Sequence, residues 1–191
     1  MGAFKPLLPF GSVTVVENCV RALQEGGVDE IIVVLGHRSD KVKERIKHLN
    51  VHFAFNSNPE SEMGESIACG VRELSLNDGS IFISLVDQPA IPSGVIRKLI
   101  QTKQQTDAKL IVPTFQNRGG HPVLVDLCLR NELLNLSAQN GLRGLIKNQN
   151  DKILRVEVES PFIRRDIDTW EEYRTLYLEI FGVEPPVHAR S

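Results

Sequence analysis

Segments with helical hydrophobic periodicity alternate with short runs of β-branched residues along most of this chain. Such alternation is typical of βαβ units, in which helices connect neighbouring strands of a mostly parallel sheet. The apolar spacing predicts helices over residues 16–26, 40–47, 67–74, 92–100, 126–136 and 141–147, and a last helix from residue 170 onward. The intervening apolar runs predict strands over 30–35, 51–55, 80–86, 109–112, 123–125 and 153–158. We therefore expect an α/β fold, a three-layer Rossmann-like arrangement with helices on both faces of a mostly parallel sheet.

Local signals mark the ends of three of these elements. Gly26 and Gly27 follow the first apolar stripe, and glycine commonly ends a helix. Thr169 and Glu172 have the spacing of a capping box, which predicts that the last helix begins directly after Thr169. The run 80–86 is almost uniformly apolar, so we expect a central strand that is covered on both faces and ends at Asp87.

Length and charge limit the organisation and the partners. A chain of 191 residues, 41% of them hydrophobic, is long enough to close one good core. We expect a single domain over residues 1–181 and a loosely held tail over 182–191. The 22 Lys and Arg residues against 24 Asp and Glu residues leave a net charge of -2, without a block of one sign. This balance argues against nucleic acid or a membrane as the main partner and favours a small-molecule substrate.

Cysteine use and hydropathy indicate the compartment. Cys19, Cys69 and Cys128 are far apart and form neither a CxxC pair nor an even-numbered framework. We interpret them as reduced packing residues in a reducing compartment. The sequence has no signal-peptide pattern, and no apolar run approaches the roughly 20 residues that span a bilayer. These features predict a cytoplasmic protein.

Asp87 is the first candidate for chemistry. Ligands of open parallel sheets bind beyond the carboxyl ends of the strands, and Asp87 directly follows the apolar run 80–86. A carboxylate there can hold Mg²⁺ on a phosphate oxygen. The alternative is a turn residue or helix cap, because Asp87-Gln88-Pro89 is also a good exit from a strand.

Asp166 and Asp168 are the second candidates. They are two positions apart, so on an extended segment both carboxylates project to the same side. They can complete a divalent-cation site with Asp87. The alternative is that they only form the neighbourhood of the N-cap of the last helix.

Other polar residues carry weaker signals. Lys5 is a lone basic residue in a short loop, where it is either solvated or bound to phosphate. The stretch 119–122 is a loop whose glycines allow close approach of backbone to a ligand, with His121 as a polar or merely structural side chain. His48 and His52 are four apart, but the helical pattern breaks between them, so we discard a zinc site. The sequence has no G-x-S-x-G, Walker or G-x-G-x-x-G motif.

Four segments, in this order, resemble the MobA-like nucleotidyltransferases of the molybdenum cofactor group, and most of all the cytidylyltransferases: Met1–Leu8, Leu85–Pro89, Gly120–Val123 and Asp166–Thr169. Weaker likenesses are Asn58-Pro59 followed by Met63–Ser66, and Gly141-Leu142-Arg143. The resemblance runs from Met1 to about Tyr177. It implies the nucleotide-diphospho-sugar transferase version of the three-layer fold.

The resemblance also implies an activity. A phosphate of the pterin cofactor would attack the α-phosphorus of a nucleoside triphosphate, CTP above all, with release of pyrophosphate. By match of motifs, the Mg²⁺ ligands would be Asp87, Asp166 and Asp168, and Lys5 would contact the triphosphate. Ser66 would line the nucleotide side, and the segment Gly120, His121 and Pro122 would face the acceptor. A molybdoenzyme or its chaperone would be a further partner.

The chain departs from the family pattern at its start. In that pattern Met-Gly-x-x-Lys follows an apolar strand and a loop Leu-Ala-Ala-Gly-x-Ser-x-Arg, whereas this chain begins at Met1. Without that strand, we expect the facing edges of two neighbouring strands to lack partners. Either the true start lies upstream of Met1, or another segment or subunit fills the gap between these strands. Two other functions stay open. One is a cofactor-binding or insertion protein without transfer, and the other is a transferase that uses GTP or a sugar or polyol phosphate acceptor.

Overall fold

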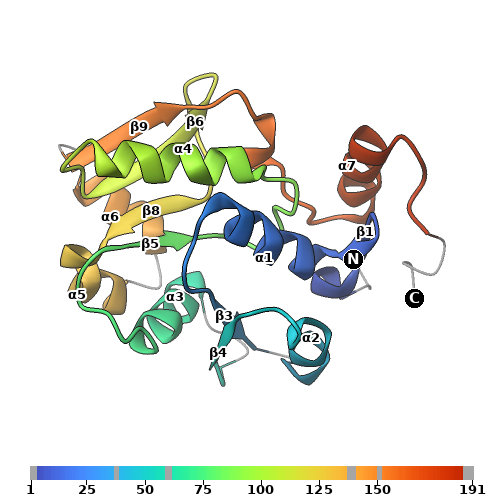
Figure 1. The fold of residues 1–191 in the computed structure, drawn as a ribbon, viewed down its shortest axis with the longest axis horizontal. Coiled ribbons are helices and arrows are strands. Elements are labelled where there is room, and N and C mark those ends of the chain that lie inside the picture. Colours follow the sequence, from blue (N-terminus) through green and yellow to red (C-terminus); the bar gives the residue numbers. More distant parts are fainter. Residues whose placement is uncertain (1–3, 37–38, 59–61, 137–140, 150–151, 187–191) are drawn as a thin grey trace.

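Helices cover both sides of a twisted sheet in the computed structural model, which describes residues 4–36, 39–58, 62–136, 141–149 and 152–186 (Figure 1). The helices are α1 Val15–Gly26, α2 Ser39–Ile46, α3 Met63–Arg72, α4 Ser93–Gln104, α5 Arg130–Leu134, α6 Gly141–Asn148 and α7 Trp170–Phe181. Short 3-10 turns are η1 Lys5–Leu7, η2 Leu127–Leu129 and η4 Pro161–Arg164. The strands are β1 Pro9–Phe10, β2 Val13–Thr14, β3 Ile32–Leu35, β4 His52–Phe55, β5 Ser80–Ile83, β6 Leu110–Phe115, β7 Arg118–Gly119, β8 Val123–Asp126 and β9 Ile153–Glu157.

The largest sheet has five strands, in the order β5-β8-β6-β7 with β9 paired to β6. β8 runs antiparallel to both β5 and β6, and β9 runs parallel to β6. β5, β6 and β9 therefore point the same way, while β8 lies reversed between two of them. The expected α/β fold with a mostly parallel sheet is confirmed, with β8 and the two-residue β7 as its antiparallel strands.

Alternate residues of the central strands enter different cores, as the period of two in a strand requires. Leu110 and Val112 of β6 join a cluster with residues of α3, α5 and α6. Ile111, between them, belongs to a cluster with residues of α4 on the other face. The sheet is therefore covered on both faces, which confirms the three-layer arrangement.

The predicted strand 80–86 is too long. β5 ends at Ile83, whose partner Val123 is the first residue of β8, so the ladder has no partner strand to continue on. The chain then turns, and the backbone amide of Gln88 donates to the Leu85 carbonyl at 3.4 Å. Asp87 thus lies in a loop and not at the strand end. β5 is also an edge strand rather than a central one, because among the described residues it pairs with β8 alone.

A second, smaller sheet consists of β3 and β4, which are parallel from Ile32 opposite His52 to Leu35 opposite Phe55. Among the described residues β3 pairs only with β4, so β3, like β5, has one edge without a partner strand. The predicted helix 126–136 is also divided, into η2 and α5. Its first turn is tightened by the Asp126 carboxylate, which accepts a hydrogen bond from the Cys128 amide at 2.9 Å.

The two ends of the described chain pack together. The hairpin of β1 and β2 lies against α7 (Figure 1), and the Tyr173 hydroxyl donates to the Pro9 carbonyl at 2.6 Å. α7 begins after the predicted capping box, in which Thr169 and Glu172 bond each other's backbone amides. This packing brings η1 beside the segment that precedes α7. Among the helices in the described ranges, none has the length and apolar character needed to cross a membrane.

Candidate functional site

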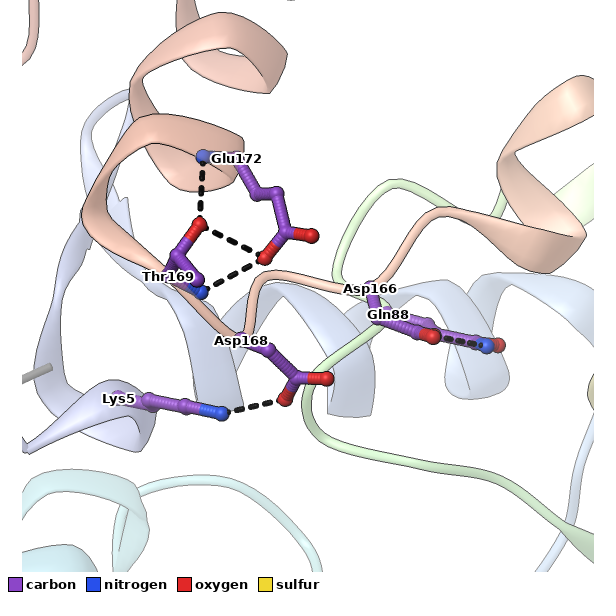
Figure 2. A network of polar contacts seen from close by, with 6 residues as sticks. All are labelled: Lys5, Gln88, Asp166, Asp168, Thr169 and Glu172. Atoms are coloured by element: carbon purple, nitrogen blue, oxygen red, sulfur yellow. Dashed lines mark hydrogen bonds and ion pairs between the residues drawn. The ribbon is translucent and has the colours of Figure 1, made fainter.

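Three contacts join the loop after β5, the segment before α7 and η1. The Ile167 amide donates to the Asp87 carbonyl at 2.9 Å. Gln88 Nε2 donates to Asp166 Oδ1 at 2.5 Å, and Lys5 Nζ donates to Asp168 Oδ1 at 2.6 Å (Figure 2). The structure therefore brings together four predicted site residues from distant parts of the chain: Lys5, Asp87, Asp166 and Asp168.

Asp87 is a half-buried carboxylate whose negative charge is not balanced by nearby partners. Its Oδ1 atom is buried and has no hydrogen-bond partner among the described residues. Burial raises the pKa of Asp87, and the charges of Asp166 and Asp168 raise it further, while Lys5 offsets only part of the shift. A divalent cation would satisfy the unpaired oxygen and relieve the repulsion among the carboxylates. Oxygen donors of this kind are the ligands that Mg²⁺ and Mn²⁺ prefer, so the residues fit such an ion.

The carboxylates do not yet form a coordination shell. In the described ranges, no three His, Cys, Asp or Glu side chains are arranged as ligands of one ion. The Asp168 carboxylate is 62% exposed and is directed to Lys5, whose side chain is 30% exposed. The carboxylate of Asp166 is directed to Gln88 (Figure 2). These side chains therefore do not converge on one point as they stand.

Two residues near the aspartates were missed by the sequence patterns. The sequence places Gln88 in a strand exit and in one of the resembling segments but assigns it no role, whereas its side-chain amide is buried and donates to Asp166. Asn18, on α1, donates from Nδ2 to the Pro89 carbonyl at 2.7 Å and so fixes the same loop. Its partner is 71 positions away, so no local pattern indicates it. For Gln88, its place directly after Asp87 was the available signal.

His121, two residues before β8, lies within electrostatic reach of Asp87 and Asp166. Its Nδ1 atom is 3.3 Å from the Ile83 carbonyl, a contact that requires Nδ1 to carry the proton. Burial lowers the pKa of His121 below its usual value, and the Ile83 carbonyl with the charges of Asp87 and Asp166 offsets part of the shift. The positive charge of Arg143 adds to the lowering. The imidazole is therefore held in its neutral form near pH 7.

The loop around His121 is fixed by close packing. A Cβ atom on Gly120 would lie 2.2 Å from the Ile163 carbonyl oxygen, so only glycine fits there. The His121 amide donates to the same carbonyl at 2.9 Å, and Pro122 is buried behind it. Gly120, His121 and Pro122 thus form a rigid wall beside the aspartates.

Ser66 is placed at a different part of the molecule. Its Oγ atom accepts a hydrogen bond at 3.0 Å from Asn56, which directly follows β4. None of the hydrogen bonds described for Ser66 joins it to the aspartates. The related motif residues Pro59 and Met1–Ala3 lie outside the described residues.

Known proteins resemble this chain in sequence and in fold. The family model described as the MobA-like NTP transferase domain matches residues 1–153. Nicotine blue oxidoreductase of Paenarthrobacter nicotinovorans is 26% identical over 180 residues, which are 90% of this chain and 87% of that protein. A nucleotidyl transferase from Methanothermobacter thermautotroptrophicus superposes with a TM-score of 0.77 at 26% identity, over 92% of this chain and 85% of that one. Rv0371c from Mycobacterium tuberculosis H37Rv, solved in complex with manganese, has a TM-score of 0.74 at 23% identity and 92% coverage of both chains.

Proposed function

The chain belongs to the MobA-like NTP transferase family, and we propose that this nucleotidyltransferase transfers CMP from CTP to a phosphate of a molybdopterin-type cofactor in the presence of Mg²⁺. One observation carries the proposal. In the part of the chain that the structure describes, Asp87 has a buried carboxylate oxygen without a partner, beside the carboxylates of Asp166 and Asp168. Such an excess of negative charge suits a site that gains a cation together with a polyanionic substrate.

The reaction needs positioning more than covalent participation by the protein. An acceptor phosphate oxygen forms a bond to the α-phosphorus of the nucleotide, the bond from that phosphorus to the bridging oxygen breaks, and pyrophosphate leaves with the electron pair. Asp87, Asp166 and Asp168 would hold the cation, which would neutralise part of the phosphate charge. Lys5 binds a triphosphate oxygen after it leaves Asp168. Each interaction acts by aligning and neutralising two polyanions.

The acceptor would bind against the wall formed by Gly120, His121 and Pro122. A neutral His121 does not attract the aspartates as a cation would, so it leaves their charge available to the metal. The close fit of Gly120 against Ile163 holds this wall in place. We assign Ser66, at the start of α3, to the nucleoside side, away from the aspartates.

A thermal-shift screen tests the nucleotide. CTP, GTP, ATP and UTP are each added with and without Mg²⁺ to the full chain, and Asp87→Asn serves as the control that keeps side-chain size. A ligand at a hundredfold excess over its Kd stabilises the folded state by about 2.7 kcal/mol, so binding is readily detected. We expect a Mg²⁺-dependent rise for CTP that is absent in the variant. A rise for GTP alone would overturn the assignment of the base.

Release of pyrophosphate then tests the acceptor. The full chain is incubated with the stabilising nucleotide, Mg²⁺ and either a molybdopterin-type acceptor, a sugar phosphate or a polyol phosphate. We expect pyrophosphate with the pterin acceptor only. Release with a sugar or polyol phosphate would move the chain to that substrate class. No response to any nucleotide in either experiment would overturn transfer and support a cofactor-binding or insertion protein of the same fold.

A further inference from the structure

Gln88 combines a buried amide with a contact to an exposed carboxylate. Its side chain is only 5% exposed, and Nε2 donates to Asp166 Oδ1 at 2.5 Å (Figure 2). The other end of the amide, Oε1, is buried without a hydrogen-bond partner among the described residues. An unpaired buried carbonyl is costly, so a glutamine at this position is a poor choice for stability alone.

Three hydrogen bonds hold the loop that carries Gln88. The Asn18 side chain of α1 donates to the Pro89 carbonyl at 2.7 Å, and the backbone amide of Gln88 donates to the Leu85 carbonyl at 3.4 Å. The Ile167 amide bonds the Asp87 carbonyl at 2.9 Å. The side chain of Gln88 therefore has little freedom to move away from Asp166.

The surroundings also set the orientation of the amide. Gln88 lines a small internal cavity whose other walls are mostly apolar, including Ile91 and Ile96. If the amide were reversed, Oε1 would face the carboxylate of Asp166 and the Nε2 donor would face this apolar cavity. Both changes are unfavourable, so the nitrogen is directed to Asp166.

Asp166 and Asp168 are held by donors of different charge. Lys5 neutralises Asp168, whereas Gln88 is neutral and leaves the full negative charge on Asp166. The amide occupies one oxygen of Asp166 and leaves the second oxygen available. A neutral donor thus fixes a carboxylate without competing with a cation for its charge.

We propose that Gln88 is a positioning residue that holds Asp166 ready to bind a divalent cation together with Asp87. This inference rests on the function proposed above, since it assigns a role within the same metal site. Partners that orient metal ligands in this way typically contribute 10–100-fold to metal affinity. Gln88 itself does not touch the ion or the substrate.

Gln88→Met tests the proposal because methionine has a similar length and neither the donor nor the unpaired carbonyl. Mn²⁺ binding to the full chain is measured directly, from free Mn²⁺ by electron paramagnetic resonance, without turnover. We expect the Mn²⁺ dissociation constant to rise roughly 10–100-fold. We expect the melting temperature without metal to stay the same or rise, because a buried unpaired oxygen is removed. Gln101→Met, at an exposed position of α4, is the matched control and should change neither quantity.

Gln88→Asn is the second variant. It keeps the amide but is shorter by one methylene, so the donor no longer reaches Asp166, and we expect the same loss of Mn²⁺ affinity. A lower melting temperature with an unchanged Mn²⁺ dissociation constant in both variants would overturn the proposal and assign Gln88 a structural role. Absence of Mn²⁺ binding by the unmodified chain would instead overturn the metal site, and with it both proposals.

Discussion

Asp126 closes one end of the β5–β8 ladder, opposite Ser80, whereas Asp87 lies past the other end, beyond Ile83. Burial acts on both carboxylates in the same direction, since it raises the pKa of each. At Asp126 the hydrogen bonds from Cys128 and Lys103, with the charge of Lys103, more than reverse this effect and hold the pKa well below its usual range. At Asp87 the charges of the nearby carboxylates Asp166 and Asp168 raise the pKa further, so it stays above its usual range.

The two carboxylates differ in the number of hydrogen-bond and ion-pair partners that the chain supplies. Asp126 is 2.7 Å from the Lys103 ammonium and 3.9 Å from that of Lys109, and it also bonds the Cys128 amide. Asp87 has a buried oxygen without a hydrogen-bond partner among the residues that the structure describes. The carboxylate of Asp126 is satisfied by groups of the chain itself, whereas the carboxylate of Asp87, which we propose to bind a cation, keeps an oxygen without a partner among the described residues. Functional sites commonly cost stability for this reason.

Replacing Asp87 should produce the largest effect. Asp87→Asn removes the charge on which the cation would bind, so we expect Mg²⁺-dependent pyrophosphate release to fall at least about 100-fold. The folded state should be kept, because the substitution also removes repulsion from Asp166 and Asp168. Turnover is measured together with far-ultraviolet circular dichroism. Full turnover in a folded variant would refute the metal role of Asp87.

Replacing Asp126 should instead affect stability. Asp126→Asn leaves the Lys103 ammonium without its anion in a mostly buried setting, so we expect the free energy of unfolding to fall by about 2 kcal/mol. Urea denaturation measures this change, and Asp107→Asn at an exposed position is the control. Mn²⁺ affinity should not change. A stable Asp126→Asn variant with weakened Mn²⁺ binding would reverse the roles of the two aspartates.

The two aspartates should also respond to pH in opposite directions. The folded-state pKa of Asp126 is lowered, so its stabilisation is present above an unfolded pKa of about 3.9 and is lost as pH falls through the folded value. The folded-state pKa of Asp87 is raised, so stability falls as pH rises from about 4 through the folded value.

Melting temperatures recorded across this pH range separate the two contributions. Without metal, Asp87→Asn should show a smaller decline in stability from acidic to neutral pH than the unmodified chain. Asp126→Asn should lose less stability on acidification. Identical pH profiles for both variants and the unmodified chain would show that neither carboxylate has a shifted pKa.

Lys5 should give the smallest change in stability. Its ion pair with Asp168 is largely exposed, and such pairs contribute about 0–1 kcal/mol. Lys5→Met should therefore melt within a few degrees of the unmodified chain, while CTP with Mg²⁺ stabilises it less. Lys41→Met, at an exposed position of α2, is a control that keeps the overall charge change the same. Equal stabilisation of both variants by CTP would exclude Lys5 from triphosphate binding.

Local patterns predicted the elements well where the signal itself is local. The end of α1 at Gly26, the capping box at Thr169 and the stripes of the longer helices all depend on neighbours within a few positions. The end of β5 does not, since it is set by where β8 begins, about 40 residues later. The short hairpin of β1 and β2 was missed because its strands have only two residues each.

The candidate site was predictable in part. The rule that ligands lie beyond strand ends singled out Asp87, although β5 stops at Ile83, and the structure brings Asp87 near Asp166 and Asp168. The contribution of Gln88 depends on the side-chain geometry of a contact across 78 positions, which no motif encodes.

The contact between Lys5 and Asp168 spans 163 positions of the chain. Closing this loop costs conformational entropy that the contact must repay once it forms, so we expect it to form after the local elements it joins. During refolding, the acidic cluster should therefore mature only after the sheet and its helices are in place. Recovery of Mn²⁺ binding in a refolding experiment would then mark the final step of assembly, behind the return of the helical signal.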